Sequence, residues 1–172
     1  PGKLVAHDLL TTDPDAARTF YRGLLGWTFE DLAGDGGIDV LISNRGQPIG
    51  GLFSARPFGG GSNVSRWIPV LSVTDVDRAV RLAETEGGTI YQAPIDLSGR
   101  GRTAVIGDSR GAVLTLVSAS RGDPKDQPPR IGDWIWDELW TDNPQQASAF
   151  YLALIEGYGI RVHYDDGEPL RI

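Results

Sequence analysis

The chain has 172 residues, with 16 Lys and Arg against 23 Asp and Glu, which gives a formal net charge of −7. An acidic chain repels the phosphates of nucleic acids and anionic lipid headgroups. Cysteine is absent and only 2 histidines occur, which excludes disulfides and Cys-ligated metal centres and disfavours imidazole-rich sites.

No apolar run in the sequence is long enough to cross a membrane, and no basic-then-apolar leader opens the chain. We therefore expect a cytoplasmic protein that binds neither nucleic acid nor membranes. The 23 Gly and 11 Pro residues indicate many turns.

A first repeat begins with a predicted strand over Leu4–Thr11. Asp13 and Pro14 then predict the start of a helix, because an Asp side chain can cap a free N–H and Pro fits the first helical position. The helix carries apolar residues at a spacing near 3.6 and ends at Gly26. These apolar residues are Ala17, Phe20, Tyr21, Leu24 and Leu25. Three short strands are predicted to follow over Trp27–Glu30, Ile38–Ser43 and Pro48–Ser54, with a Gly-rich turn at 34–37.

A second repeat has the same order after a flexible connection at 58–65. A strand is predicted over Trp67–Val73, and a helix capped by Thr74 or Asp75 ends at Gly87 and Gly88. The strands predicted after this helix are Thr89–Tyr91, Arg102–Ile106 and Ala112–Val117. Both repeats therefore have the order β-α-β-β-β.

A third repeat is incomplete. It has a predicted strand at Trp134–Trp140, a helix that starts at Asn143-Pro144, and later strands at 160–164 and 168–172. We therefore predict one complete domain over 1–120, built of modules 1–58 and 64–120, then a linker at 121–133 and the start of a second, incomplete domain at 134–172. Open sheet edges in this last part favour a homo-oligomer.

The run Asp13–Trp27 reads Asp-Pro-x-x-Ala-x-x-Phe-Tyr-x-x-Leu-x-Gly-Trp. With the paired modules, it resembles the vicinal oxygen chelate superfamily, which includes glyoxalases, bleomycin-resistance proteins and extradiol dioxygenases. The segment 101–113 resembles the closing hairpin of that fold, and Trp134–Leu139 resembles the opening of the second domain in two-domain, hydroxylase-like members. The resemblance implies an α+β fold whose βαβββ modules form a cup-shaped mixed sheet with helices on its outer face.

Metal-using members of this superfamily place His or Glu ligands on the first and last strands of each module. The matching first-strand positions here are Ala6 and Ile68, and the last-strand Glu of the second module falls near Thr115. The fourth strand of the first module offers only 50–53, Gly-Gly-Leu-Phe. These residues lack the anionic or imidazole donors that a divalent ion needs, so we expect no metal and no other cofactor.

Asp8 is the acidic residue expected inside the cup, because strand alternation puts it on the same face as Ala6. It could bind a cationic group or act as a general base, and it is a weak candidate for a catalytic residue. The alternative is a structural carboxylate that is held by hydrogen bonds to a neighbouring loop or an Arg. Glu138 is its counterpart in the third repeat. Phe53, Trp67, Tyr91 and Thr115 complete the predicted ligand site, with core packing as the alternative for the aromatic residues.

His7 should face the helix layer, opposite Asp8, as a structural residue, whereas His163 could belong to a site. Arg100 and Arg102 could meet an anionic ligand or be solvated loop residues. The sequence favours a metal-independent protein that binds a small, partly aromatic molecule in the cup. The alternatives are a metal-dependent lyase, isomerase or dioxygenase of the same superfamily, a metal-free acid–base enzyme, and a structural half of an oligomeric assembly.

Overall fold

The computed structural model describes residues 1–32, 40–54 and 65–155. Two units of the same order fill most of this part of the chain. The first contains β1 (Leu4–Thr11), α1 (Pro14–Leu25), β2 (Thr28–Asp31), β3 (Val40–Asn44) and β4 (Gln47–Ser54). The second contains β5 (Arg66–Ser72), α2 (Val76–Thr85), β6 (Thr89–Leu97), β7 (Gly101–Gly107) and β8 (Val113–Ala119), and α3 (Pro144–Leu154) follows.

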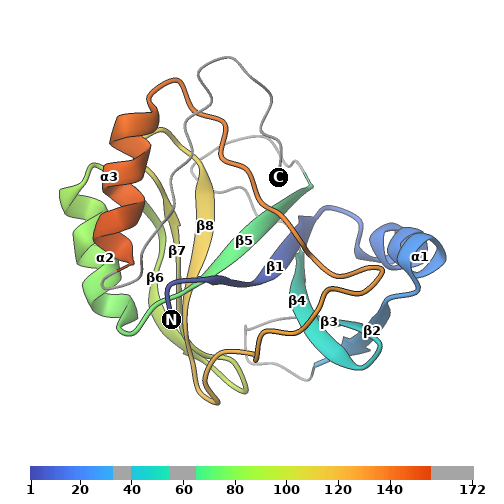
Figure 1. Cartoon of the computed structure of the whole chain (residues 1–172). Helices are drawn as coiled ribbons and strands as arrows, with labels where there is room; N and C mark the ends of the chain where they lie inside the picture. Colours follow the sequence, from blue (N-terminus) through green and yellow to red (C-terminus); the bar gives the residue numbers. More distant parts are fainter. Residues whose placement is uncertain (33–39, 55–64, 156–172) are drawn as a thin grey trace.

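All eight strands form one sheet in the order β2-β3-β4-β1-β5-β8-β7-β6. The two units meet where β1 pairs with β5 in antiparallel fashion. Each first strand also pairs in parallel with the last strand of its own unit, β1 with β4 and β5 with β8. The sheet is curved, with α1 and α2 on its outer side (Figure 1). This confirms the predicted α+β fold of paired βαβββ modules.

The helix starts follow the predicted capping residues. The side chains of Asp13, Asp75 and Asn143 each accept a hydrogen bond from the backbone N–H three residues later, at 2.9–3.1 Å. Such caps satisfy N–H groups that have no partner inside the helix. Gly26 ends α1 with φ 70°, a left-handed conformation that glycine adopts without strain.

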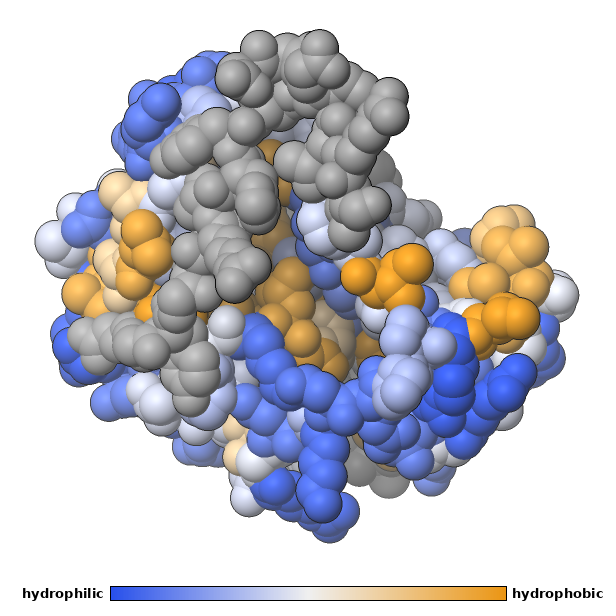
Figure 2. Space-filling view, in the orientation of Figure 1, coloured by the Kyte–Doolittle hydropathy of each residue, from blue (hydrophilic) through white to orange (hydrophobic). Residues whose placement is uncertain are grey.

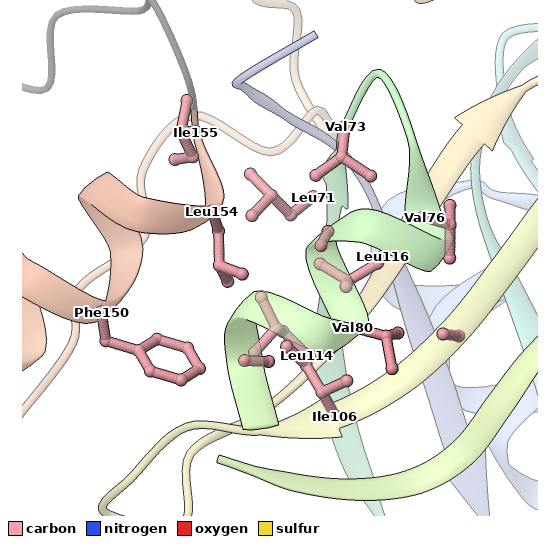
Figure 3. Close-up of a cluster of buried hydrophobic side chains, with 13 residues drawn as sticks. Leu71, Val73, Val76, Val80, Ile106, Leu114, Leu116, Phe150, Leu154 and Ile155 are labelled. Atoms are coloured by element: carbon pink, nitrogen blue, oxygen red, sulfur yellow. The ribbon is translucent and has the colours of Figure 1, made fainter. Parts of the chain in front are cut away.

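Two hydrophobic clusters lie between the outer face of the sheet and the helices. One contains Leu9, Trp27, Val40, Ile42 and Leu52, with α1 residues packed against it. The other joins α2 to the second unit and also takes in Phe150, Leu154 and Ile155 from α3 and the residue after it (Figure 3). The third repeat therefore shares a core with the second module, rather than starting a separate one within the described residues.

The strand predicted over Trp134–Trp140 is wrong, because these residues form no strand. Their contacts are made by side chains instead. Trp134 packs against the hydrophobic cluster under α1, and Asp137 pairs with His7. The indole N–H groups of Trp136 and Trp140 both donate to Glu138, at 3.0 and 3.1 Å. A β-strand needs a neighbouring strand to bond its backbone, and the apolar pattern alone does not supply one.

Several predicted features lie outside the described residues: the turn at 34–37, the connection over 58–64, the strands at 160–164 and 168–172, and His163. Within the described ranges, no helix combines the length and apolar character needed to cross a membrane.

Candidate ligand-binding site

Asp8 lies on the inner face of the sheet, opposite the helices. Its neighbour Leu9 belongs to the cluster under α1, and alternation along β1 turns Asp8 to the other side. On the adjacent strands, Leu71 and Leu116 pair in register and face the α2 cluster, so Thr115 also points inward. The carboxylate of Asp8 is buried, with the residue 2% exposed.

Four hydrogen bonds hold the Asp8 carboxylate. The Arg100 guanidinium donates two, from Nη1 to Oδ1 at 3.1 Å and from Nη2 to Oδ2 at 2.6 Å. The backbone N–H of Gly51 donates to Oδ1 at 3.0 Å, and the Thr115 hydroxyl donates to Oδ2 at 3.4 Å. A buried carboxylate needs a partner of opposite charge and filled lone pairs, and this arrangement provides both.

Arg100 also brings Phe53 into the group, since its guanidinium carbon lies 6.0 Å from the centroid of the Phe53 ring. Phe53 pairs in register with Leu10. Leu10 lies two residues after Asp8 on β1 and so faces the same side of the sheet, which places Phe53 on the inner face as well. Asp8, Arg100, Phe53 and Thr115 therefore form one constellation, which we call the inner-face cluster. It joins three of the predicted ligand-site residues through Arg100, for which the sequence left two alternatives, a contact with an anionic ligand or a solvated loop position.

The sequence carries one signal for Arg100, which is that glycines stand on both sides of it. Gly99 and Gly101 have φ of 74° and 111°, and a Cβ on Gly101 would lie 2.2 Å from the Ser118 carbonyl oxygen. These glycines shape the tight turn that carries Arg100 over the inner face. Arg102, two residues on, instead pairs with Asp77 and Asp96.

The other predicted site residues lie elsewhere. Trp67 is on the outer face, where its Nε1 donates to the Tyr21 hydroxyl at 2.8 Å and its ring contacts those of Trp27 and Trp134. Tyr91 is on β6, at the end of the sheet, with its ring against Gly107. Glu138 is exposed between its two indole donors.

The residues of the inner face do not fit a divalent metal ion. The expected ligand positions hold Ala6, Ile68 and Thr115, and both oxygens of Asp8 are already engaged by Arg100. No group of three or more His, Asp or Glu side chains in residues 1–32, 40–54 and 65–155 is placed to hold a metal.

A separate groove of about 540 Å³ lies between the start of β1 and residues 124–137. At its edge, the His7 ring contacts the tilted ring of Trp134, with centroids 4.1 Å apart, and His7 Nε2 lies 2.6 Å from Asp137 Oδ1. Burial opposes ionisation of Asp133, but hydrogen bonds from Arg130 and Asn44 outweigh it and lower the pKa of that carboxyl. These contacts fix residues 130–137 against the first module.

No family model matches the chain. It is 33% identical over 150 residues to "Putative glyoxylase CFP32" of Mycobacterium tuberculosis, covering 86% of this chain and 58% of that protein. It is 29% identical over 167 residues to the anthracycline biosynthesis protein DnrV of Streptomyces peucetius, covering 90% of this chain and 61% of that protein. The chain thus spans only about 58–61% of the length of these relatives.

Among solved structures, methylmalonyl-CoA epimerase from Mycobacterium tuberculosis aligns with a TM-score of 0.49 and 20% identity, covering 68% of this chain and 87% of that one. The epimerase from Streptomyces coelicolor, in complex with 2-nitronate-propionyl-CoA, aligns with a TM-score of 0.48 and 18% identity, covering 69% of this chain and 97% of that one.

Proposed function

We propose that this chain belongs to the vicinal oxygen chelate superfamily and that it binds a small, partly aromatic molecule at the inner-face cluster without a metal ion. The paired modules and the glyoxylase-named relatives support the superfamily. The contacts of Asp8 support the absence of a metal.

The single observation that carries the proposal is that both carboxylate oxygens of Asp8 already accept hydrogen bonds from the protein. Its two oxygens accept four hydrogen bonds, two of them from a cationic side chain. A metal ion would have to displace Arg100 and would still gain only one anionic ligand from the cluster. Divalent ions in proteins need several such ligands together.

The same cluster can hold an organic ligand. Phe53 offers a flat apolar surface next to a guanidinium, and each terminal nitrogen of Arg100 has a second hydrogen beyond the one it gives to Asp8. A ligand that combines a planar ring with a carbonyl or carboxylate oxygen would stack on Phe53 and accept from Arg100. Shape and a few placed polar groups are the usual basis of such sites.

A metal measurement and a binding titration test this function. Purified protein should contain no stoichiometric zinc, iron, nickel or manganese. An anthracycline is a suitable fluorescent probe, because it is planar and oxygen-rich and two relatives are named for anthracycline biosynthesis. It should bind saturably, with the same affinity in EDTA as in added Zn²⁺. Phe53→Ala should weaken binding about tenfold or more, since it removes the stacking surface.

Phe29→Ala is the matched control, because Phe29 is a half-buried phenylalanine that packs in the cluster under α1. It should leave the affinity unchanged. Stoichiometric metal in the purified protein, binding that EDTA abolishes, or equal losses in both variants would contradict the proposal.

A further inference from the structure

Two large apolar side chains on α1 are in contact with solvent. Phe20 is 58% exposed and Leu24 is 63% exposed. They are four residues apart and so form one stripe on the helix surface. Apolar side chains gather at the surface where α1 lies, at the right of Figure 2. Such a stripe is typical of a surface that another element covers.

The third repeat shows what covers the same residues in α3. Its helix repeats the sequence of α1, with Phe150 at the position of Phe20 and Leu154 at the position of Leu24. There the two residues are only 1% and 5% exposed. They lie in the cluster formed with α2 (Figure 3). The same pair is therefore buried between helices in one copy and exposed in the other.

The α1 helix uses a different stripe to contact its own module. Ala17, Tyr21 and Leu25 pack against the cluster of the first unit and are half-buried. Phe20 and Leu24 are not needed for that contact, since they point away from it. Because α3 buries Phe150 and Leu154 against the helix of another module, the repeat assigns Phe20 and Leu24 to a contact between modules.

We propose that the Phe20–Leu24 stripe of α1 docks the helix of a further βαβββ module, in the way that α3 docks on α2. The occupant should resemble α2, whose half-buried Leu82 stands at the repeat position of Phe20 and packs against the cluster that contains Phe150 and Leu154. A glycine should follow its helix, because Gly88 lies under the Phe150 ring, where a Cβ would come within 3.0 Å of that ring.

The α1 surface has room for this contact. A Cβ added to Gly23 would meet nothing within 4 Å, so a partner helix can approach closely between Phe20 and Leu24. The chain's own α2 is not available for it, because α3 already packs there. This inference concerns assembly and does not depend on ligand binding at the inner-face cluster.

A peptide of residues 74–88, stapled at the exposed positions of Arg81 and Thr85, is the probe for this docking. Titrated into the ¹⁵N-labelled chain, it should shift the amide resonances of α1. The double variant Phe20→Ser with Leu24→Ser should raise the dissociation constant at least tenfold. Because both side chains are mostly exposed, this variant should keep the melting temperature of the unmodified chain.

The controls are Leu152→Ala, which removes a 47% exposed leucine on α3, and a peptide carrying Leu82→Asp. The first should bind the peptide normally, and the second peptide should not bind. Shifts confined to other elements, or equal affinity of the double variant, would overturn the proposal. Self-association of the chain alone that the double variant abolishes would also overturn it, since the stripe would then bind a second copy.

Discussion

Replacing Arg100 with Met should destabilise the protein by about 3–5 kcal/mol, because it leaves a buried carboxylate without its counter-charge. Asp8 is 2% exposed, and Arg100 provides two of its four hydrogen bonds. The Gly51 N–H and the Thr115 hydroxyl remain, but both are neutral donors. Small domains are stable by about 5–15 kcal/mol, so the loss should be large in urea unfolding at neutral pH.

The companion variants separate the missing charge from lost packing. Asp8→Asn combined with Arg100→Met removes both charges but keeps an acceptor for the Gly51 N–H, so it should recover at least about 2 kcal/mol of the loss. Thr115→Val removes only a 3.4 Å hydrogen bond and should cost less than about 1 kcal/mol. If the double variant is no more stable than Arg100→Met alone, the argument from charge compensation is wrong.

Two other predictions concern single positions. Gly50→Ala should destabilise the protein by at least about 2 kcal/mol, because the new Cβ would lie 1.8 Å from the His7 carbonyl oxygen. Gly23→Ala is the control: a Cβ at Gly23 meets open space, so this variant should be neutral or stabilising by up to about 1 kcal/mol. Equal melting temperatures of the two variants would contradict this prediction. Burial raises the pKa of Tyr151, and so does the nearby Asp108 carboxylate, which accepts a hydrogen bond from the Tyr151 hydroxyl. The contribution of Tyr151 to stability should therefore be complete below about pH 10 and fall as the pH rises further. Tyr151→Phe should flatten this alkaline decline in urea unfolding measured from pH 9 to 11, and an identical decline in both proteins would exclude Tyr151 as its source.

Much of the fold could be predicted from short stretches of sequence. Asp13, Asp75 and Asn143 cap helices through a backbone N–H only three residues away, so their effect is visible locally. The repeat of strand, capped helix and three strands then implied two similar modules. The inward direction of Asp8 followed from alternation along one strand.

The partner of Asp8 could not be predicted in this way. Arg100 lies 92 positions along the chain from Asp8, and its Gly-rich neighbourhood did not indicate which of the arginines would meet this carboxylate. Trp67 has the pattern of a cleft residue, yet strand β5 turns it toward Tyr21 and Trp27 on the outer face. Residues 134–140 have the composition of a strand, but they pair with none of the eight strands in the described part of the chain.

The sequence by itself therefore determined the modules, their order and the helix boundaries, because capping and periodicity act over a few residues. Only the tertiary structure decided which charges meet inside the cup and which apolar residues stay exposed. Those outcomes depend on contacts between segments far apart in the chain. The same Phe and Leu of the repeated helix can therefore be buried in one copy and exposed in another. Phe150 is buried and Phe20 is exposed because α3 lies against another helix, whereas the outer side of α1 faces solvent.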